Sequence, residues 1–222
     1  SGVGKSTTAR ALFAALNCET GGCGACELCQ KMSRDAHPDL LRVEPTGAGE
    51  FITVAQIREL VGRLAYTPHE CTDRVILLKD ADRLTVEAAN ALLKSLEEPP
   101  ARTRFVLCTA APDQLPVTVR SRCQLVRFAP LGRRDLVDIL VAQGHLERDA
   151  ARAASLSDGS AARAIELLTE GALERRAQLA GRILDAARTD RFEAMSQAAA
   201  ELAPHKEDLV PTLQWLALFY RD

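Results

Sequence analysis

The stretch RVILLKDADRL, residues 74–84, carries a run of apolar residues that ends in an acidic residue. Residues 75–78 are apolar on both faces of an extended chain, which is typical of a strand inside a parallel sheet that is covered on both sides. Asp80 follows the run as the acidic residue of a Walker B strand does, and it would help to hold Mg²⁺. In a nucleotide hydrolase the next residue is usually a glutamate that activates water, but here it is Ala81.

The chain begins SGVGKST, residues 1–7, which matches the second half of the phosphate-binding pattern G-x-x-x-x-G-K-[ST]. Glycines let backbone N–H groups close around phosphate oxygens, and the N-terminus of the next helix adds its dipole. Lys5 would reach the β- and γ-phosphates, and the Ser6 hydroxyl would bind Mg²⁺. The alternative is a glycine-rich helix start without a ligand. The residues expected to bind ATP and Mg²⁺ are Gly2, Gly4, Lys5, Ser6, Thr7 and Asp80. Because the chain opens inside the motif, we expect it to be a piece of a longer protein.

Strand and helix patterns alternate as far as residue 130. We expect strands at 39–45, 74–80, 103–110 and 123–130, helices at 53–68 and 85–100, and a short helix or turn at 115–122. Thr53 is a suitable N-cap, and two prolines stop the second helix. This alternation predicts an α/β P-loop domain with a doubly wound parallel sheet over residues 1–130.

Only helical patterns follow residue 130. Three short ones predict a small helical bundle over residues 131–170, and longer ones over 171–222 predict the start of a third, helical unit.

Seven cysteines are present, and four of them lie within twelve residues. Their spacing is Cys18-x4-Cys23-x2-Cys26-x2-Cys29, and short Cys-x2-Cys turns place two thiolates on one metal ion. Four cysteine ligands leave no open position, so we predict a structural Zn²⁺ site; free thiols or a redox pair are the alternatives. His37 is a spare candidate ligand, although the turn HPD before a strand explains it better. The remaining cysteines are expected to be small residues in or near the core: Cys71, Cys108 and Cys123.

The composition indicates a globular protein without a membrane role. The 222 residues carry a formal net charge of −2, so the total charge indicates neither nucleic acid nor membrane binding. No apolar run reaches the roughly 18 residues that span a bilayer, and no signal peptide is visible. We therefore predict a cytoplasmic location.

The phosphate loop, the cysteine cluster, NALLKSLEEPP (residues 90–100) and SRC (residues 121–123) occur in this order on one chain. That combination resembles the bacterial DNA polymerase III clamp loader, an AAA+ assembly. The resemblance implies an AAA+ domain at 1–130, a helical lid at 131–170 and the start of a helical collar at 171–222. It also implies partners: other clamp loader subunits (gamma/tau and delta), the sliding clamp and primed DNA.

Two subunit types of that assembly carry these motifs, the ATPase motor (gamma/tau) and delta prime. A working motor of the family has a glutamate after the Walker B aspartate, a polar sensor 1 residue and a sensor 2 arginine. The corresponding positions here hold Ala81, Ala110 and Ala162. The resemblance therefore favours a delta prime subunit of DNA polymerase III, itself poor or inactive in ATP hydrolysis. A gamma/tau-type motor is the alternative, and a zinc-stabilised regulatory ATP-binding module outside replication is a second.

Arg122 is the remaining candidate catalytic residue. In the resembling family the arginine of SRC enters the ATP site of a neighbouring subunit, where an arginine finger stabilises the charge that develops on the transferred phosphoryl group. The alternative is a surface arginine in a helix-to-strand turn.

Two charged stretches receive simpler interpretations. Lys79, Asp82 and Arg83 are expected to form a solvated strand end, and Glu97 with Glu98 a helix end, because neighbours on a helix point in different directions.

Overall fold

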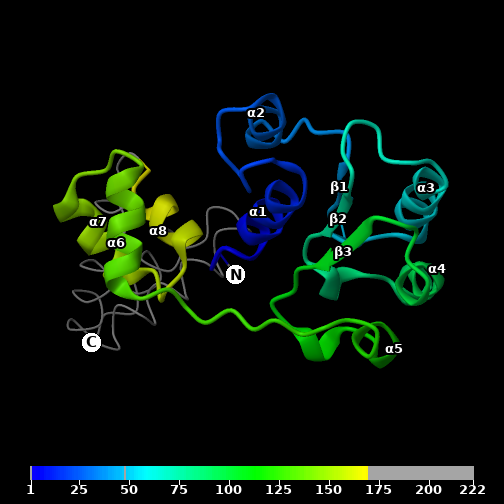
Figure 1. Cartoon of the computed structure of the whole chain (residues 1–222). Helices are drawn as coiled ribbons and strands as arrows, with labels where there is room; N and C mark the ends of the chain where they lie inside the picture. The colour runs from blue at the N-terminus through cyan, green and yellow to red at the C-terminus, as the bar shows by residue number, and fades with distance from the viewer. Residues whose placement is uncertain (1, 48, 170–222) are drawn as a thin grey trace, which may run out of the picture. The chain divides into compact units, whose positions relative to one another are not determined.

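The computed structural model describes residues 2–47 and 49–169, which divide into two compact units (Figure 1). One unit comprises Gly4–Arg127, and the other combines the chain from Phe128 onward with the residues before Gly4. The collar helices predicted at 171–222 lie outside the described residues.

The first unit is built on a three-stranded parallel sheet in the order β1-β2-β3. The strands are β1 (Leu40–Val43), β2 (Arg74–Leu78) and β3 (Thr103–Leu107). The central strand β2 is buried along its whole length, as its unbroken apolar sequence predicts. These three strands lie within the ranges predicted from the sequence.

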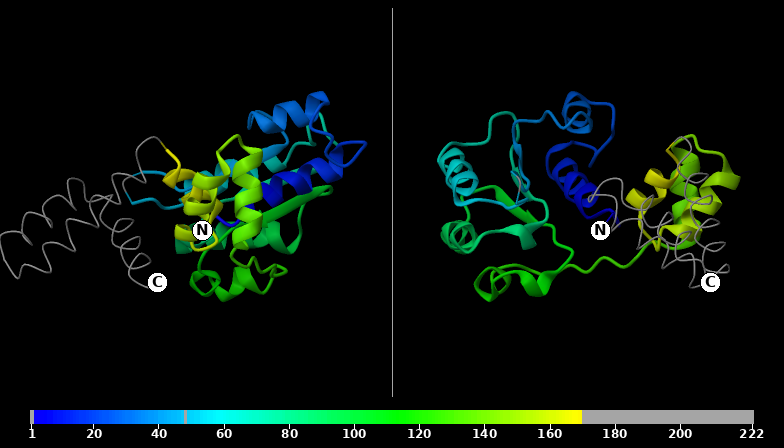
Figure 2. Two further views of the ribbon diagram at one scale, coloured as in Figure 1. Left: turned by 90° about the vertical axis from the view of Figure 1, so that its left-hand side faces the viewer. Right: turned by 180° about the vertical axis from the view of Figure 1, so that it is seen from behind.

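Helices cover both faces of the sheet, α1 and α2 on one side and α3 and α4 on the other (Figures 1 and 2). Their bounds are α1 Lys5–Asn17, α2 Glu27–Ser33, α3 Val54–Leu64 and α4 Val86–Glu97. Alternate residues of β2 point to opposite faces. Val75 and Leu77 pack toward α1, whereas Ile76 and Leu78 join the core formed with α3 and α4. The doubly wound α/β arrangement is therefore confirmed.

Threonine side chains cap the N-termini of α3 and α4. The Thr53 hydroxyl accepts the Gln56 N–H at 3.4 Å and the Gln56 side chain accepts the Thr53 N–H at 2.9 Å, a complete capping box at the start of α3. Thr85 caps α4 by accepting the Ala88 N–H at 3.2 Å. The α2 helix inside the cysteine-rich loop was not predicted.

The strand predicted at 123–130 does not form. These residues follow the short helix α5 (Val117–Arg120) and make no ladder, and Leu125 and Val126 are 55% and 67% exposed. A strand needs a neighbour that offers a free backbone edge. Among the described residues β3 pairs only with β2, and no further strand lies beside it to receive residues 123–130. A sequence pattern can indicate an extended chain but cannot provide the partner strand.

The described part of the second unit comprises three short helices that pack together. Its helices are α6 (Arg133–Ala142), α7 (Glu147–Leu156) and α8 (Ala161–Leu167). They share a small core of Leu140, Ala150, Ala153, Ala164 and Leu167. In the part of the chain that the structure describes, no helix combines the length and the apolar character that crossing a membrane requires.

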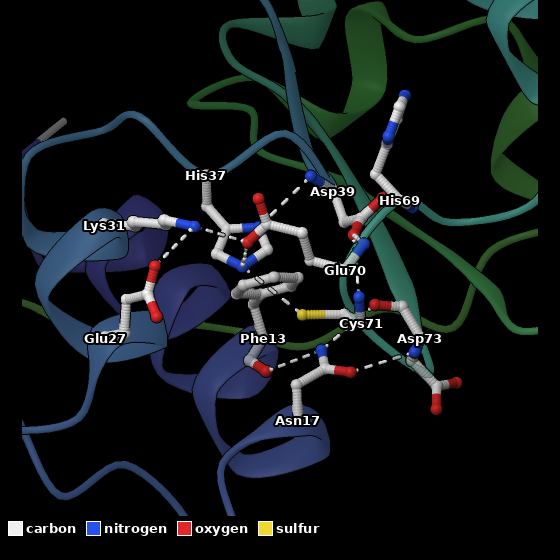
Figure 3. Close-up of polar contacts among 10 residues, drawn as sticks. All are labelled: Phe13, Asn17, Glu27, Lys31, His37, Asp39, His69, Glu70, Cys71 and Asp73. Carbon is white, nitrogen blue, oxygen red and sulfur yellow. Dashed lines mark hydrogen bonds and ion pairs between the residues drawn. The ribbon is translucent and has the colours of Figure 1, made fainter.

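A buried carboxylate ties the start of β1 to the loop before β2 (Figure 3). Asp39 is 1% exposed, and its two oxygens accept the N–H groups of His69, Glu70 and Cys71 at 2.6, 2.8 and 2.9 Å. Burial raises the pKa of Asp39, but the three N–H groups together lower it by more than burial raises it. The pKa of Asp39 therefore lies below its ordinary value. The ionised carboxylate therefore stabilises this loop.

We expect Asp39→Asn to lower the free energy of unfolding by about 2–4 kcal/mol at pH 7, because the buried N–H groups lose a charged acceptor. A carboxylate with a lowered pKa stabilises the fold above its unfolded pKa, and this contribution disappears as the pH falls through the folded pKa. The difference between the two proteins should therefore vanish in acid. Urea unfolding from pH 7 downward measures it. Asp113→Asn, on a side chain that is 95% exposed, is the control and should change stability by less than about 0.5 kcal/mol; an equal effect of both variants would contradict the prediction.

Candidate functional site

The four cysteines predicted to bind zinc come together between α1 and α2. Cys18 directly follows α1, Cys26 precedes α2, and Cys29 lies in the first turn of α2. With Cys23, their sulfur atoms all lie within 4.8 Å of one another, and those of Cys18 and Cys26 are 3.9 Å apart. Zinc–sulfur bonds of about 2.3 Å in a tetrahedron separate two sulfurs by about 3.8 Å. The arrangement therefore fits a closed site with four thiolates.

Backbone N–H groups and the neighbouring thiols set the charge of this cluster. Two N–H groups of the following turn donate to the Cys23 sulfur at 3.4 and 3.3 Å. The Cys23 N–H is the main cause that lowers the pKa of Cys18 to about 5. The Gly24 N–H lowers the pKa of Cys29, but burial and the three neighbouring thiols raise it to about 11. If a metal ion binds, four sulfur ligands leave it no open position.

A second group of candidate ligand atoms lies in the loops that precede β1 and β2 (Figure 3). The atoms of His37, Asp39 and Cys71 are within 4.8 Å of one another, and His37 Nε2 is 3.4 Å from the Cys71 sulfur. The oxygens of Asp39 already accept backbone N–H groups, and burial raises the pKa of the Cys71 thiol to about 11. Burial also lowers the pKa of His37, whose ring packs edge-on against Phe13 at 4.8 Å. This group is therefore a packed contact.

The phosphate-loop residues occupy the start of α1. Gly4 has φ +92°, a left-handed conformation that suits glycine, and its carbonyl accepts the Thr8 N–H at 2.9 Å. The N–H groups of Lys5, Ser6 and Thr7 therefore belong to the first turn of a helix, where N–H groups have no intrahelical partner and attract anions. Gly2 lies in the other unit, where its carbonyl accepts the Ala161 N–H at 3.0 Å.

The end of β2 lies near this helix start. Burial raises the pKa of the Cys108 thiol, a hydrogen bond with Ser6 and the charge of Lys5 lower it, and the charge of Asp80 raises it. The structure thus brings Lys5, Ser6 and Asp80 around one buried sulfur, next to the C-terminal ends of β2 and β3. This geometry fits a phosphate with Mg²⁺, which Ser6 and Asp80 would hold.

The structure shows where the three alanines lie that replace the expected hydrolysis residues. Ala81 is fully buried, and its N–H donates to the Cys108 carbonyl at 2.8 Å. Ala110 is exposed after β3, and Ala162 is exposed in α8.

The charged stretch after β2 is more organised than predicted. Lys79 forms an ion pair with Glu44 at 2.8 Å. Asp82 is half-buried, and one of its oxygens accepts the Thr109 hydroxyl at 2.5 Å and the Ala110 N–H at 3.3 Å. Asp82 therefore joins the end of β2 to the loop after β3. No local sequence signal marks this contact, because Thr109 and Ala110 lie 27 and 28 residues after Asp82 in the chain.

Arg122 lies just after α5 and is held by its own chain. Its guanidinium contacts Glu97, at the end of α4, through Nε at 2.7 Å and through Nη2, and its Nη1 donates to the Thr118 carbonyl at 2.8 Å. The side chain keeps 34% of its surface exposed. The sequence interpretation of Glu97 as a plain helix end missed this partner.

Comparison with known proteins places this geometry in a family. Residues 1–132 match the family described as DNA polymerase III, delta subunit. The chain belongs to this family. The resemblance to clamp loader subunits of DNA polymerase III, predicted from the sequence, is thereby confirmed.

Three relatives of the chain carry two different subunit names, delta' and tau. It is 41% identical over 126 residues to the delta' subunit of DNA polymerase III from Pseudomonas aeruginosa, covering 55% of this chain and 38% of that protein. It is 36% identical over 169 residues to the delta' subunit of Bacillus subtilis, covering 75% and 50%, and 40% identical over 126 residues to the tau subunit of Salmonella typhimurium, covering 55% and 19%. The chain thus spans between about a fifth and a half of the length of these relatives.

Similar solved structures include a DNA polymerase III gamma subunit-related protein from Thermotoga maritima. It is 21% identical, with a TM-score of 0.44 over 97% of this chain and 77% of that one. The RuvB Holliday junction branch migration motor of the same organism is 14% identical, with a TM-score of 0.48 over 94% of this chain and 61% of that one.

We expect Cys23→Ser to reduce the zinc content of the purified protein from about one ion per chain to near zero, because three thiolates and a hydroxyl bind zinc poorly. Elemental analysis after dialysis measures the content, and thermal unfolding with and without a chelator measures its effect on stability. Cys123→Ala, a cysteine outside the cluster, should keep the metal. Full zinc retention in Cys23→Ser would contradict the four-thiolate site.

Proposed function

We propose that this chain is a delta prime-type subunit of a replicative clamp loader that helps to place the sliding clamp on primed DNA. The names of its relatives and its family support a role in the DNA polymerase III assembly. Its partners would be the gamma/tau and delta subunits, the clamp and DNA. The DNA-directed DNA polymerase (nucleotidyltransferase) activity would belong to the assembly and not to this chain alone. The location of the chain would be the cytoplasm.

The observation that carries the delta prime assignment is the shortage of carboxylates beside the phosphate loop. Hydrolysis needs one acidic group for Mg²⁺ and a second to activate water, and a general base typically contributes about 10²–10⁴-fold in rate. Within residues 79–82 the candidates are Asp80 and Asp82, and Asp82 is engaged by the Thr109 hydroxyl. Asp80 alone would serve Mg²⁺. The chain would bind ATP without cutting it efficiently, and the zinc would be structural.

Arg122 would then be the contribution of this chain to catalysis, as an arginine finger in the ATP site of a neighbouring subunit. Its guanidinium is partly exposed and lies on the surface formed by α4 and α5. Arginine suits this role because its planar fork matches the geometry of phosphoryl oxygens. A finger supplied in trans is worth about 10³–10⁵-fold in rate at the site that it enters.

A gamma/tau-type motor is the second candidate, supported by the well-kept Gly4-Lys5-Ser6 sequence and by the tau relatives. A zinc-stabilised regulatory ATP-binding module outside replication is the third. Capture of clamp loader subunits by the intact protein would separate this third function from the other two.

We expect Arg122→Ala to lower clamp- and DNA-stimulated ATP hydrolysis by the assembled loader. Turnover at the one neighbouring site should fall about 10³-fold or more. The total rate of ATP hydrolysis should therefore fall by the fraction that this site contributes to it. Arg120→Ala is the matched control, because Arg120 lies two residues away, pairs with Asp113 at 2.8 Å, and should change the rate little. Undiminished turnover with Arg122→Ala would remove the finger assignment, and ATP hydrolysis by the isolated wild-type chain would favour the motor.

A further inference from the structure

Two of the motifs singled out in the sequence, LEEPP and SRC, meet in the structure. Glu97 is the last residue of α4, and Arg122 follows α5, 25 residues later in the chain. The two helices pack together through apolar residues such as Leu92 and Val119, which belong to one core cluster. The contact between the charged side chains is therefore built on a rigid base.

The guanidinium of Arg122 is held at every nitrogen. Nε donates to Glu97 Oε1 at 2.7 Å, and Nη2 pairs with the same oxygen. Nη1 donates to the Thr118 carbonyl at 2.8 Å and to the Ser121 hydroxyl at 3.2 Å. A guanidinium has five N–H donors, so these contacts leave one N–H, on Nη2, without a partner among the described residues.

Such an arrangement limits the conformations of a side chain that is otherwise flexible. An unrestrained arginine on a surface samples many rotamers, and ordering it in a neighbour's site would oppose binding. A planar fork that is already fixed loses less freedom when it meets its target. Exposed ion pairs contribute little to global stability, so the Glu97 contact is better explained by the geometry of Arg122 than by the stability of the fold.

We propose that Glu97 is a positioning residue for Arg122, orienting the guanidinium toward the phosphates of the nucleotide bound by the neighbouring subunit. This inference rests on the proposed function, because it requires Arg122 to act in trans. Glu97 does not touch the nucleotide. It fixes the edge of the guanidinium formed by Nε and Nη2, while Thr118 and Ser121 fix the opposite edge.

The test compares Glu97→Ala with Glu98→Ala in the assembled loader. The two glutamates are adjacent, but the contacts found for Arg122 are to Glu97. We expect Glu97→Ala to lower turnover at the one neighbouring ATP site roughly two- to fivefold, the range that an exposed ion pair supports. The total rate of clamp- and DNA-stimulated ATP hydrolysis should therefore fall by less than it does with Arg122→Ala. KM for ATP, loader assembly and the unfolding midpoint should stay unchanged. Glu98→Ala should match the wild type, and Glu97→Gln, which keeps an acceptor but loses the charge, should lie between.

A double-mutant cycle separates positioning from other effects. In the background of Arg122→Ala, adding Glu97→Ala should cause no further loss. A loss of equal size in both backgrounds would overturn the proposal, as would an unchanged or raised rate in Glu97→Ala alone. If Arg122→Ala itself has no effect, the proposed function fails and the inference fails with it. If Arg122→Ala lowers the rate but Glu97→Ala does not, only the positioning role is overturned.

Discussion

The central constraint on this structure is the complete burial of β2. Residues 75–78 have no exposed surface, so each of their backbone groups needs a partner strand and each face needs a covering helix. β1 and β3 provide the backbone partners, and α1 on one face and α3 with α4 on the other provide the cover. Because α1 begins with the phosphate-loop residues, covering β2 also places Lys5 and Ser6 at the C-terminal end of the strand. The candidate nucleotide site thus depends on the packing of one apolar strand.

The cysteine cluster extends the same principle at the other end of α1. A short loop with several glycines cannot bury enough apolar surface to fold alone, so a bound metal ion, as proposed, and an anchor would both stabilise it. The sulfur cluster provides the ligands, and the ion pair between Lys31 and Glu70, 2.7 Å long, holds α2 to the loop that Asp39 orders. The proposed metal ion and the buried carboxylate would therefore support one another through α2 and that loop.

Local patterns predicted the elements well, and long-range partners explain what they missed. The capping box of α3, the apolar run of β2 and the cysteine spacing are all contained in a few neighbouring residues, and each is present as predicted. The strand at 123–130 failed because its formation depends on a neighbour, which no local pattern reports. The same holds for Asp82 with Thr109 and for Glu97 with Arg122, whose partners lie 27 and 25 residues away. Their sequences show charges but not which charges meet.

The burial of Ala81 limits which side chains the structure can accept after Asp80. Its methyl group belongs to the core shared with α3 and α4, whereas α1 with its phosphate-loop residues covers the opposite face of the sheet. A longer acidic side chain at residue 81 would start inside an apolar cluster, and burying an unpaired charge there would cost far more than it gained. Restoring a water-activating carboxylate would therefore require a change in how the chain leaves β2, in addition to a substitution. Asp80 already departs from regular geometry there, with φ +47°. The packing around Ala81 therefore supports the proposal of an inactive ATP site, and the partly exposed Arg122 remains the residue proposed to serve a neighbour.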